Sequence, residues 1–244
     1  MRFEAVVFDL FGTLVPGFSE ERFNSSLAAM AAALGVDAEE FIRQWSFETW
    51  EDRATGRLET IEANVRQICE ALGAMPSEDQ VKEGVRIRVA FAREILKPRG
   101  DAMSTLKEIK GAGREIGLIS DCSAEVPTLW PETGLEPLID VAIFSCVAGM
   151  KKPDPRIYHL ACEGLGVSPQ RCLYVGDGFS QELAGASQVG MTAVLIAPPG
   201  EEWADPSENE RAAWRGPVVE TLSEVAKMVL GEDAEAQTRR MSDS

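Results

Sequence analysis

Short apolar segments alternate with helix-like segments throughout the second half of this chain. Each apolar segment has the length and composition of a buried strand. Strands that alternate with helices favour a parallel β-sheet covered by helices on both faces. The expected strands lie at residues 115–120, 141–145, 172–175 and 192–196.

A further apolar segment, Ala5–Phe8, predicts a strand near the amino terminus. A long stretch with helical periodicity separates it from the other strands. The periodic apolar positions are Phe23, Leu27, Met30, Ala31 and Leu34, then Ile61, Val65, Ile68 and Leu72, then Val81, Val85, Val89 and Ala92. We therefore expect this stretch to be an insertion, a cap, between the first and second strands.

Composition narrows the range of functions. The 244 residues include 40 acidic and 24 basic ones, and the net charge of -16 opposes binding to nucleic acid or to an anionic membrane. No leader and no apolar run long enough to span a bilayer is evident, so the cytoplasm is the expected location. The single histidine, His159, has no partner motif around it, which argues against a Ser-His-Asp mechanism or a zinc site.

Polar residues stand where the expected strands end. Asp9 follows the first strand, Ser120 and Asp121 close the second, Lys152 comes after the third, and Asp177 follows the fourth. In an open parallel sheet the carboxyl ends of the strands form one edge, where ligands bind. The sequence thus predicts that carboxylates, a hydroxyl and a lysine converge in space.

These positions resemble the four motifs of the haloacid dehalogenase (HAD) superfamily. The matching residues are Asp9-Leu10-Phe11-Gly12-Thr13-Leu14 for motif I, Ser120 for motif II, Lys152 for motif III, and Gly176-Asp177 with Glu182 for motif IV. The motifs occur in order between residues 3 and 197, and the ordered set is far more specific than any one of them.

The resemblance implies an α/β fold, with a Rossmann-like parallel sheet as the core and an inserted all-helical cap of the C1 subclass. We expect the core at residues 1–16 and 97–230 and the cap at residues 17–96. Residues 231–244 are polar and are expected to form a mobile acidic tail.

The resemblance also implies roles for the residues at the sheet edge. Asp9 would be the covalent nucleophile, Ser120 would bind the transferring group and Lys152 would steady the intermediate. The metal expected is Mg²⁺, which prefers oxygen ligands and would separate two carboxylates that otherwise repel. Its expected site consists of Asp9, Asp177 and the backbone carbonyl of Phe11, with Glu182 orienting bound water. Thr13 and Asp121 are expected to face the substrate.

Phe11 departs from the phosphatase pattern, which has a second aspartate at this position as general acid and base. Three hypotheses follow. The preferred one is a magnesium-dependent phosphohydrolase of a small phosphorylated metabolite, acting through an aspartyl-phosphate. The alternative is a 2-haloacid dehalogenase, which needs no acid to expel halide and has an aromatic residue here, although the metal-free dehalogenases do not keep a residue like Asp177. The third is a catalytically weak binding or regulatory protein.

A cationic and aromatic group in the cap bears on the substrate. If residues 39–53 form one helix, Arg43, Phe47 and Trp50 share a face opposite to Phe41 and Trp45. Arg43 and Trp50 could cradle a halide or a substrate carboxylate. Alternatively, this face is surface packing or a contact between two copies of the chain, so a homodimer is an open alternative.

Overall fold

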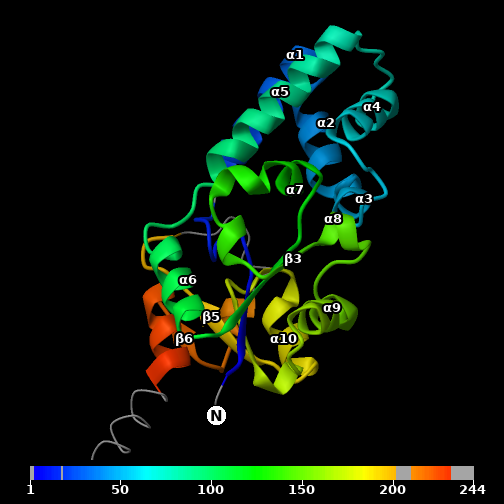
Figure 1. The fold of residues 1–244 in the computed structure, drawn as a ribbon. Helices are drawn as coiled ribbons and strands as arrows, with labels where there is room; N and C mark the ends of the chain where they lie inside the picture. The colour runs from blue at the N-terminus through cyan, green and yellow to red at the C-terminus, as the bar shows by residue number, and fades with distance from the viewer. Residues whose placement is uncertain (1–2, 18, 202–209, 232–244) are drawn as a thin grey trace, which may run out of the picture.

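A six-stranded parallel sheet forms the centre of the molecule, as the computed structural model shows for residues 3–17, 19–201 and 210–231 (Figure 1). The strand order is β3-β2-β1-β4-β5-β6. The strands are β1 (Ala5–Phe8), β2 (Glu115–Ser120), β3 (Val141–Phe144), β4 (Cys172–Gly176), β5 (Thr192–Ile196) and β6 (Val218–Val219). The predicted α/β fold class and its parallel sheet are confirmed. Only the two-residue strand β6 was not predicted.

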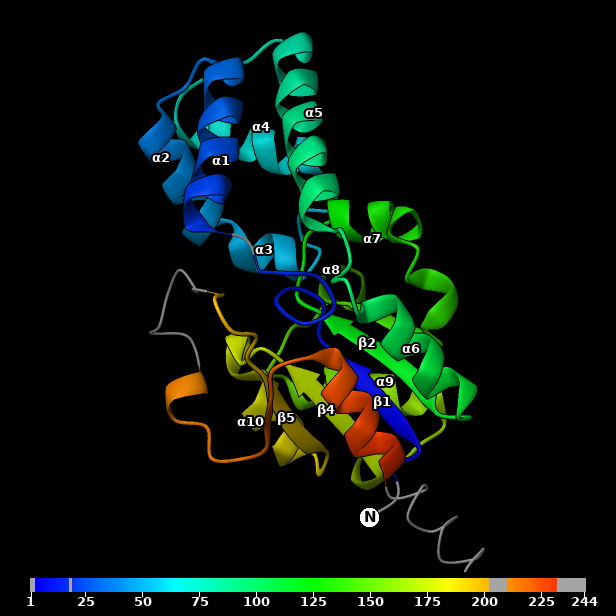
Figure 2. The ribbon, with the colours of Figure 1, turned by 90° about the vertical axis from the view of Figure 1, so that its left-hand side faces the viewer.

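Helices cover both faces of this sheet because its strands alternate side chains between two apolar cores (Figure 2). In β1, Val6 and Phe8 pack on one side, with α6 (Ala102–Gly111) and a helix over residues 222–231. Ala5 and Val7 pack on the other side, with α9 (Pro155–Leu165) and α10 (Glu182–Gln188). Both faces are buried, as a parallel sheet requires.

A group of helices, which we call the cap helices, stands at one end of the sheet (Figures 1 and 2). They are α1 (Glu20–Leu34), α2 (Ala38–Arg43), a π-helix (Gln44–Glu48), α3 (Trp50–Ala54), α4 (Ile61–Ala71) and α5 (Glu78–Ile95). Ser19, Asp37, Thr60 and Ser77 cap four of them, each side chain accepting a hydrogen bond from a backbone N–H in the first turn. The cap helices have an apolar core of their own around Leu27, Met30 and Trp45.

Shorter elements complete the fold. They are α7 (Glu125–Leu129), α8 (Ser145–Ala148) and 3-10 turns at Trp130–Thr133, Glu136–Leu138, Pro169–Arg171, Phe179–Gln181 and Glu210–Ala212. Among the residues that the structure describes, no helix is both long and apolar enough to cross a membrane. The core and cap boundaries at residues 16 and 96 stay predictions, and the predicted tail lies outside the described residues except for Gly231.

The single helix expected at residues 39–53 is wrong. A π-helical turn at Gln44–Glu48 interrupts it, with the N–H of Thr49 donating to the carbonyl of Gln44, and α3 starts afresh at Trp50. A π-turn adds a residue to the helical repeat, so the side chains beyond it rotate away from the faces that a regular α-helix would give them.

The buried stripe of α5 also differs from the predicted one. Val85 and Val89 are half-buried, whereas the buried positions are Val81, Gly84, Arg88, Phe91, Ala92 and Ile95. The stripe therefore contains an arginine, Arg88, that is buried among apolar side chains.

We predict that Arg99→Met destabilises the protein by about 1 to 3 kcal/mol, because buried hydrogen-bond acceptors lose their donor. Arg99 follows α5, and its guanidinium donates to the carbonyls of Gly12 and Thr13 at 2.8 Å each and pairs with Glu201. Urea denaturation measures the loss. The control is Arg93→Met, which breaks only a half-exposed pair with Glu132 and should cost much less. Equal losses would contradict the prediction.

Candidate active site

The register of the sheet brings the two predicted metal-binding aspartates together. Phe8 of β1 lies opposite Val175 of β4, and the N–H of Asp9 donates to the carbonyl of Val175 at 2.9 Å. Asp177 leaves β4 at the same edge, two residues after Val175. Gly12, at φ 74°, turns the chain sharply after Asp9, in a conformation that suits glycine.

Lys152 bridges two buried carboxylates at this edge. Its Nζ donates to Oδ1 of Asp9 at 2.6 Å and to Oε2 of Glu182 at 2.5 Å, and all three side chains are almost completely buried. Carboxylate oxygens of Asp9, Asp177 and Glu182 lie within 4.8 Å of one another. The group therefore holds three acids and one ammonium out of contact with water.

Glu182 is fixed by neighbours on both of its oxygens. The Tyr174 hydroxyl donates to Oε2 at 2.7 Å, and the N–H of Gly178 donates to Oε1 at 3.0 Å. Two non-glycine residues, Ser180 and Gln181, adopt left-handed conformations just before it, which costs about 1 to 2 kcal/mol each. Glu182 thus reaches the site through a strained turn. Because Tyr174 and Gly178 hold its carboxylate in place, Glu182 can orient Lys152.

Burial shifts the pKa values of the two aspartates upward. Burial raises the pKa of Asp9 to about 7, against the lowering effect of the Lys152 charge. Burial, followed by the charges of Glu182 and Asp9, raises the pKa of Asp177 well above its usual range. Both shifts indicate that three ionised carboxylates close together are unfavourable in this buried cluster. A bound cation would offset their negative charge.

The remaining predicted polar residues are Ser120, Thr13 and the half-buried Asp121. Ser120 and Thr13 are fully buried, and their hydroxyls have no hydrogen-bond partner among the described residues. Asp121 accepts a hydrogen bond from the backbone N–H of Lys152 at 3.0 Å through Oδ1, while its Oδ2 has no partner there. Burial raises the pKa of Asp121. These unpaired groups are the ones that a bound ligand would use.

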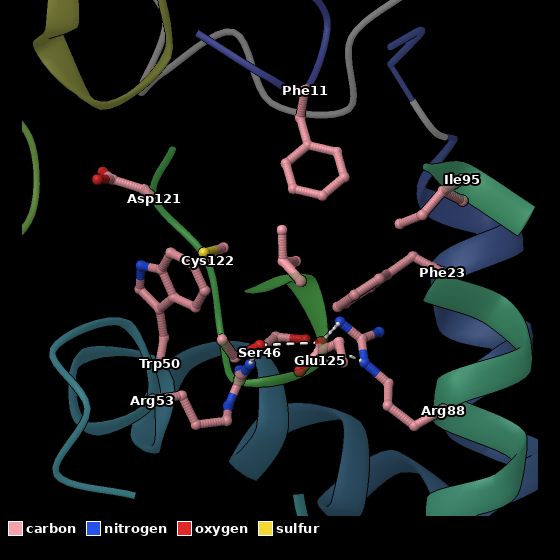
Figure 3. A pocket seen from close by; sticks show the side chains of 12 residues that line it. Phe11, Phe23, Ser46, Trp50, Arg53, Arg88, Ile95, Asp121, Cys122 and Glu125 are labelled. Atoms are coloured by element: carbon pink, nitrogen blue, oxygen red, sulfur yellow. Dashed lines mark hydrogen bonds and ion pairs between the residues drawn. The ribbon is translucent and has the colours of Figure 1, made fainter. Parts of the chain in front are cut away.

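A pocket of about 170 Å³ lies between this edge of the sheet and the cap helices (Figure 3). Phe11 and Asp121 line one end of it, at the top of the figure. Trp50 of α3 lines the side, and its contact with a substrate stays a prediction. The pocket therefore adjoins motif I through Phe11 and motif II through Asp121.

Arg43 does not take the predicted place in this pocket. Its guanidinium is about half exposed and pairs with Glu40 at 2.9 Å and Glu48 at 2.8 Å. The π-helical turn that follows it puts Trp50 on a different face of the chain from Arg43. The expected pairing of Arg43 with Trp50 at the substrate is therefore corrected.

Two arginines that the sequence analysis missed line the pocket instead: Arg53 of α3 and Arg88 of α5. Arg53 lies over the rings of Trp45 and Trp50, 4.5 and 5.3 Å from their centres. Arg88 stands three, four and seven positions before Phe91, Ala92 and Ile95, a spacing that indicates one helix face, and the i, i+3 spacing from Trp50 was a signal for Arg53.

One carboxylate, Glu125 of α7, joins these arginines to the core. Arg88 donates to its Oε1 through Nε and Nη2, at 2.9 and 2.6 Å, and the Ser123 hydroxyl donates to the same oxygen. Arg53 donates to the Ser123 hydroxyl at 3.3 Å and to the carbonyl of Trp45 at 2.5 Å. The cap helices and the end of β2 thus meet through a buried polar network.

A parallel sheet with a nucleophile-like aspartate, a lysine and further acids at its carboxyl edge, under inserted helices, defines a hydrolase of the haloacid dehalogenase type. The haloacid dehalogenase-like hydrolase family model matches residues 3–190. The chain belongs to this family.

Its relatives include both chemistries. The chain is 29% identical to (S)-2-haloacid dehalogenase 4A of Burkholderia cepacia, over 79% of this chain and 82% of that protein. It is 28% identical to glyceraldehyde 3-phosphate phosphatase of Methanopyrus kandleri, over 79% and 83%. Among solved structures, 2-haloacid dehalogenase of Pseudomonas syringae aligns with a TM-score of 0.67 at 25% identity, over 95% of this chain and 99% of that one.

We predict that Gly176→Ala lowers activity by roughly 100-fold, because a new methyl group would displace Glu182 and, with it, Lys152. A Cβ at this position would lie 2.2 Å from Oε1 of Glu182. The control is Gly111→Ala in α6, where a Cβ would meet nothing within 4 Å. Steady-state kinetics on any turned-over substrate would decide, and equal activities of the two variants would refute the close approach.

We also predict that the ionised carboxylate of Glu125 stabilises the folded protein at neutral pH and loses this effect in acid. Burial alone would raise the pKa of Glu125, but the charge of Arg88, a backbone hydrogen bond and the charge of Arg53 outweigh it, so the folded-state pKa lies below its ordinary value. The ionised group therefore stabilises the fold above the unfolded pKa of about 4.3, and this contribution disappears as pH falls through the folded value.

Glu125→Gln should then cost about 3 to 5 kcal/mol at pH 7, since it leaves Arg88 without its buried partner. The difference from the unsubstituted protein should shrink below about pH 4, as Glu125 itself takes up a proton. Urea denaturation at a series of pH values measures this. A difference that does not change with pH would show that the charge of Glu125 is not what stabilises the network.

Proposed function

We propose that this hydrolase is a magnesium-dependent phosphohydrolase of a small phosphorylated metabolite. The observation that supports it most is the close placement of three buried carboxylates, Asp9, Asp177 and Glu182, around a single ammonium. A metal-free dehalogenase gains nothing from a second acid beside its nucleophile, and the burial of that acid is unfavourable.

The donor set fits Mg²⁺, which prefers hard oxygen ligands. Asp9 and Asp177 would hold it with the backbone carbonyl of Phe11. Glu182, whose oxygens are engaged by Lys152, Tyr174 and Gly178, would act through the groups around the metal. When bound, the ion supplies charge stabilisation to the phosphoryl oxygens and relieves the repulsion between the acids.

The side chains of this chain would then perform two displacements. An oxygen of Asp9 forms a bond to phosphorus while the bond from phosphorus to the ester oxygen breaks, giving an aspartyl-phosphate and an alkoxide that takes a proton from solvent. Water then attacks the phosphorus, which releases inorganic phosphate and restores the carboxylate. Lys152 and the hydroxyl of Ser120 would bind the phosphoryl oxygens in both steps.

Dehalogenation is the second candidate, and two observations favour it. Phe11 removes the aspartate that would protonate an alkoxide, whereas a leaving halide needs no proton. Arg53, between the rings of Trp45 and Trp50, offers a cation and aromatic edges of the kind that could cradle halide. A catalytically weak regulatory role, a cytoplasmic location and a homodimer stay further proposals.

A panel of phosphate monoesters, acyl phosphates and 2-haloacids, each assayed with Mg²⁺ and with chelator, tests the proposal. We expect phosphate release only with Mg²⁺, because the buried acids need the cation before Asp9 can attack. Asp177→Asn should abolish both turnover and the saturable Mg²⁺ site seen by calorimetry. The control is Glu163→Gln, which changes an exposed carboxylate on α9 and should leave both unaltered. Haloacid turnover that persists in chelator would replace this proposal with dehalogenation.

Phe11→Asp should raise turnover of an unactivated alkyl phosphate by roughly tenfold or more, because it places a general acid two residues after the nucleophile. Esters with good leaving groups should gain much less. Phe11 lines the pocket, and its loss could cost about 3 kcal/mol of packing, so calorimetry must first show that the variant is folded. A folded variant with no preferential gain on poor leaving groups would show that the absent acid does not limit the reaction.

A further inference from the structure

The pocket between the cap helices and the sheet contains an excess of positive charge. Arg53 and Arg88 are 4% and 7% exposed, and the only carboxylate that either of them contacts among the described residues is that of Glu125. Arg53 donates to neutral acceptors, namely Thr49, Ser123 and the carbonyl of Trp45. Two buried cations therefore share one acid.

Buried charges in proteins are paired, because an uncompensated one is costly. Burial, followed by the charge of Arg88, lowers the pKa of Arg53 to about 9, so Arg53 stays charged at neutral pH despite this cost. Two further polar atoms in the network, Nη1 of Arg88 and Oε2 of Glu125, have no hydrogen-bond partner among the described residues. An anion beside the arginines would accept from Nη1 of Arg88 and balance the second cation, whereas Oε2 of Glu125 would take a donor.

This surplus charge faces a pocket that reaches Phe11 and Asp121, which lie close to Asp9 and Ser120 in the chain. Phe11 and Asp121 line one end of the pocket, and Arg53 and Arg88 lie toward the other, at the bottom of Figure 3. Ser123, which Arg53 contacts, is three residues after Ser120 in the loop that leaves β2. A small molecule in this pocket could present one end to Asp9 and the other to the arginines.

We propose that Arg53, supported by Arg88, binds a carboxylate at the non-reacting end of the substrate, so that the substrate class is a small phosphate monoester with a terminal carboxylate. This inference rests on the phosphohydrolase function proposed above. A guanidinium fork matches the planar carboxylate with two parallel hydrogen bonds. The pocket volume of about 170 Å³ suits a short molecule, and the rings of Trp45 and Trp50 hold the plane of Arg53 in place.

Matched substrate pairs test the subsite. Each pair consists of a short phosphate monoester that ends in a carboxylate and the same ester with a neutral carboxamide, and a bisphosphate of equal length distinguishes a preference for phosphate. We expect kcat/KM to favour the carboxylate by roughly 100-fold, because the amide would leave the buried cation unpaired. A preference for the bisphosphate would mean that Arg53 binds a second phosphate group, and it would overturn the carboxylate assignment.

Arg53→Met is the informative variant, because the buried ion pair between Arg88 and Glu125 remains and the variant is expected to fold. It should lower kcat/KM for the carboxylated ester by about 30- to 100-fold and change that for the carboxamide by less than about threefold. Arg53→Lys, which keeps the charge but not the fork, should recover part of the loss. The control is Arg66→Met, at a half-exposed arginine of α4 that pairs with Glu78.

Binding without turnover separates this inference from the proposed function. Calorimetry with a short phosphonate that bears a carboxylate, against the alkylphosphonate of equal length, should show tighter binding of the carboxylated one, and Arg53→Met should remove the difference. If phosphate esters are hydrolysed but the carboxylate makes no difference in either assay, the subsite is refuted and the phosphohydrolase stands. If no phosphate ester is hydrolysed and neither phosphonate binds, the proposed function fails as well.

Discussion

The arrangement of the acids at the sheet edge depends on the ion pairs that the Lys152 ammonium makes with Asp9 and Glu182. This ammonium lies between Asp9 and Glu182, and Lys152 is the one basic side chain that contacts these acids among the described residues. One positive charge cannot compensate three buried carboxylates, and the raised pKa values of Asp9 and Asp177 express that deficit. The same imbalance would favour a bound cation, as the proposed function requires.

The opposite imbalance exists at the other end of the pocket. There Arg53 and Arg88 exceed the single acid Glu125, and aromatic rings exclude water from them. The acids therefore lie toward the sheet edge, and the arginines lie at the opposite end of the pocket, under the cap helices. A ligand with a fixed separation between its charged groups would be oriented by the field of these charges before any bond is made.

Much of the core could be predicted from the sequence, because strand and motif coincide there. The runs Ala5–Phe8, Glu115–Ser120 and Cys172–Gly176 are largely apolar, and the predicted site residues Asp9, Ser120 and Asp177 stand at their carboxyl ends. Strand β6 could not be predicted, since two valines after a proline give no periodic signal. Nor could the pairing of Lys152 with Glu182, which joins residues 30 positions apart through a strained turn.

The cap helices were predicted as helices, and the buried faces of α1 and α4 were predicted correctly, but those of α5 and of the segment around the π-helical turn were not. One π-helical turn after Arg43 was enough to exchange that residue for Arg53 at the pocket, and no local pattern announces such a turn. The order of the chain has a further consequence. The groups at the sheet edge all come from segments before residue 17 or after residue 97, whereas Arg53 and Arg88 belong to the intervening stretch. If Arg53 binds the substrate as proposed, mutation of that stretch would change the substrate over evolutionary time while the residues at the sheet edge stay unchanged.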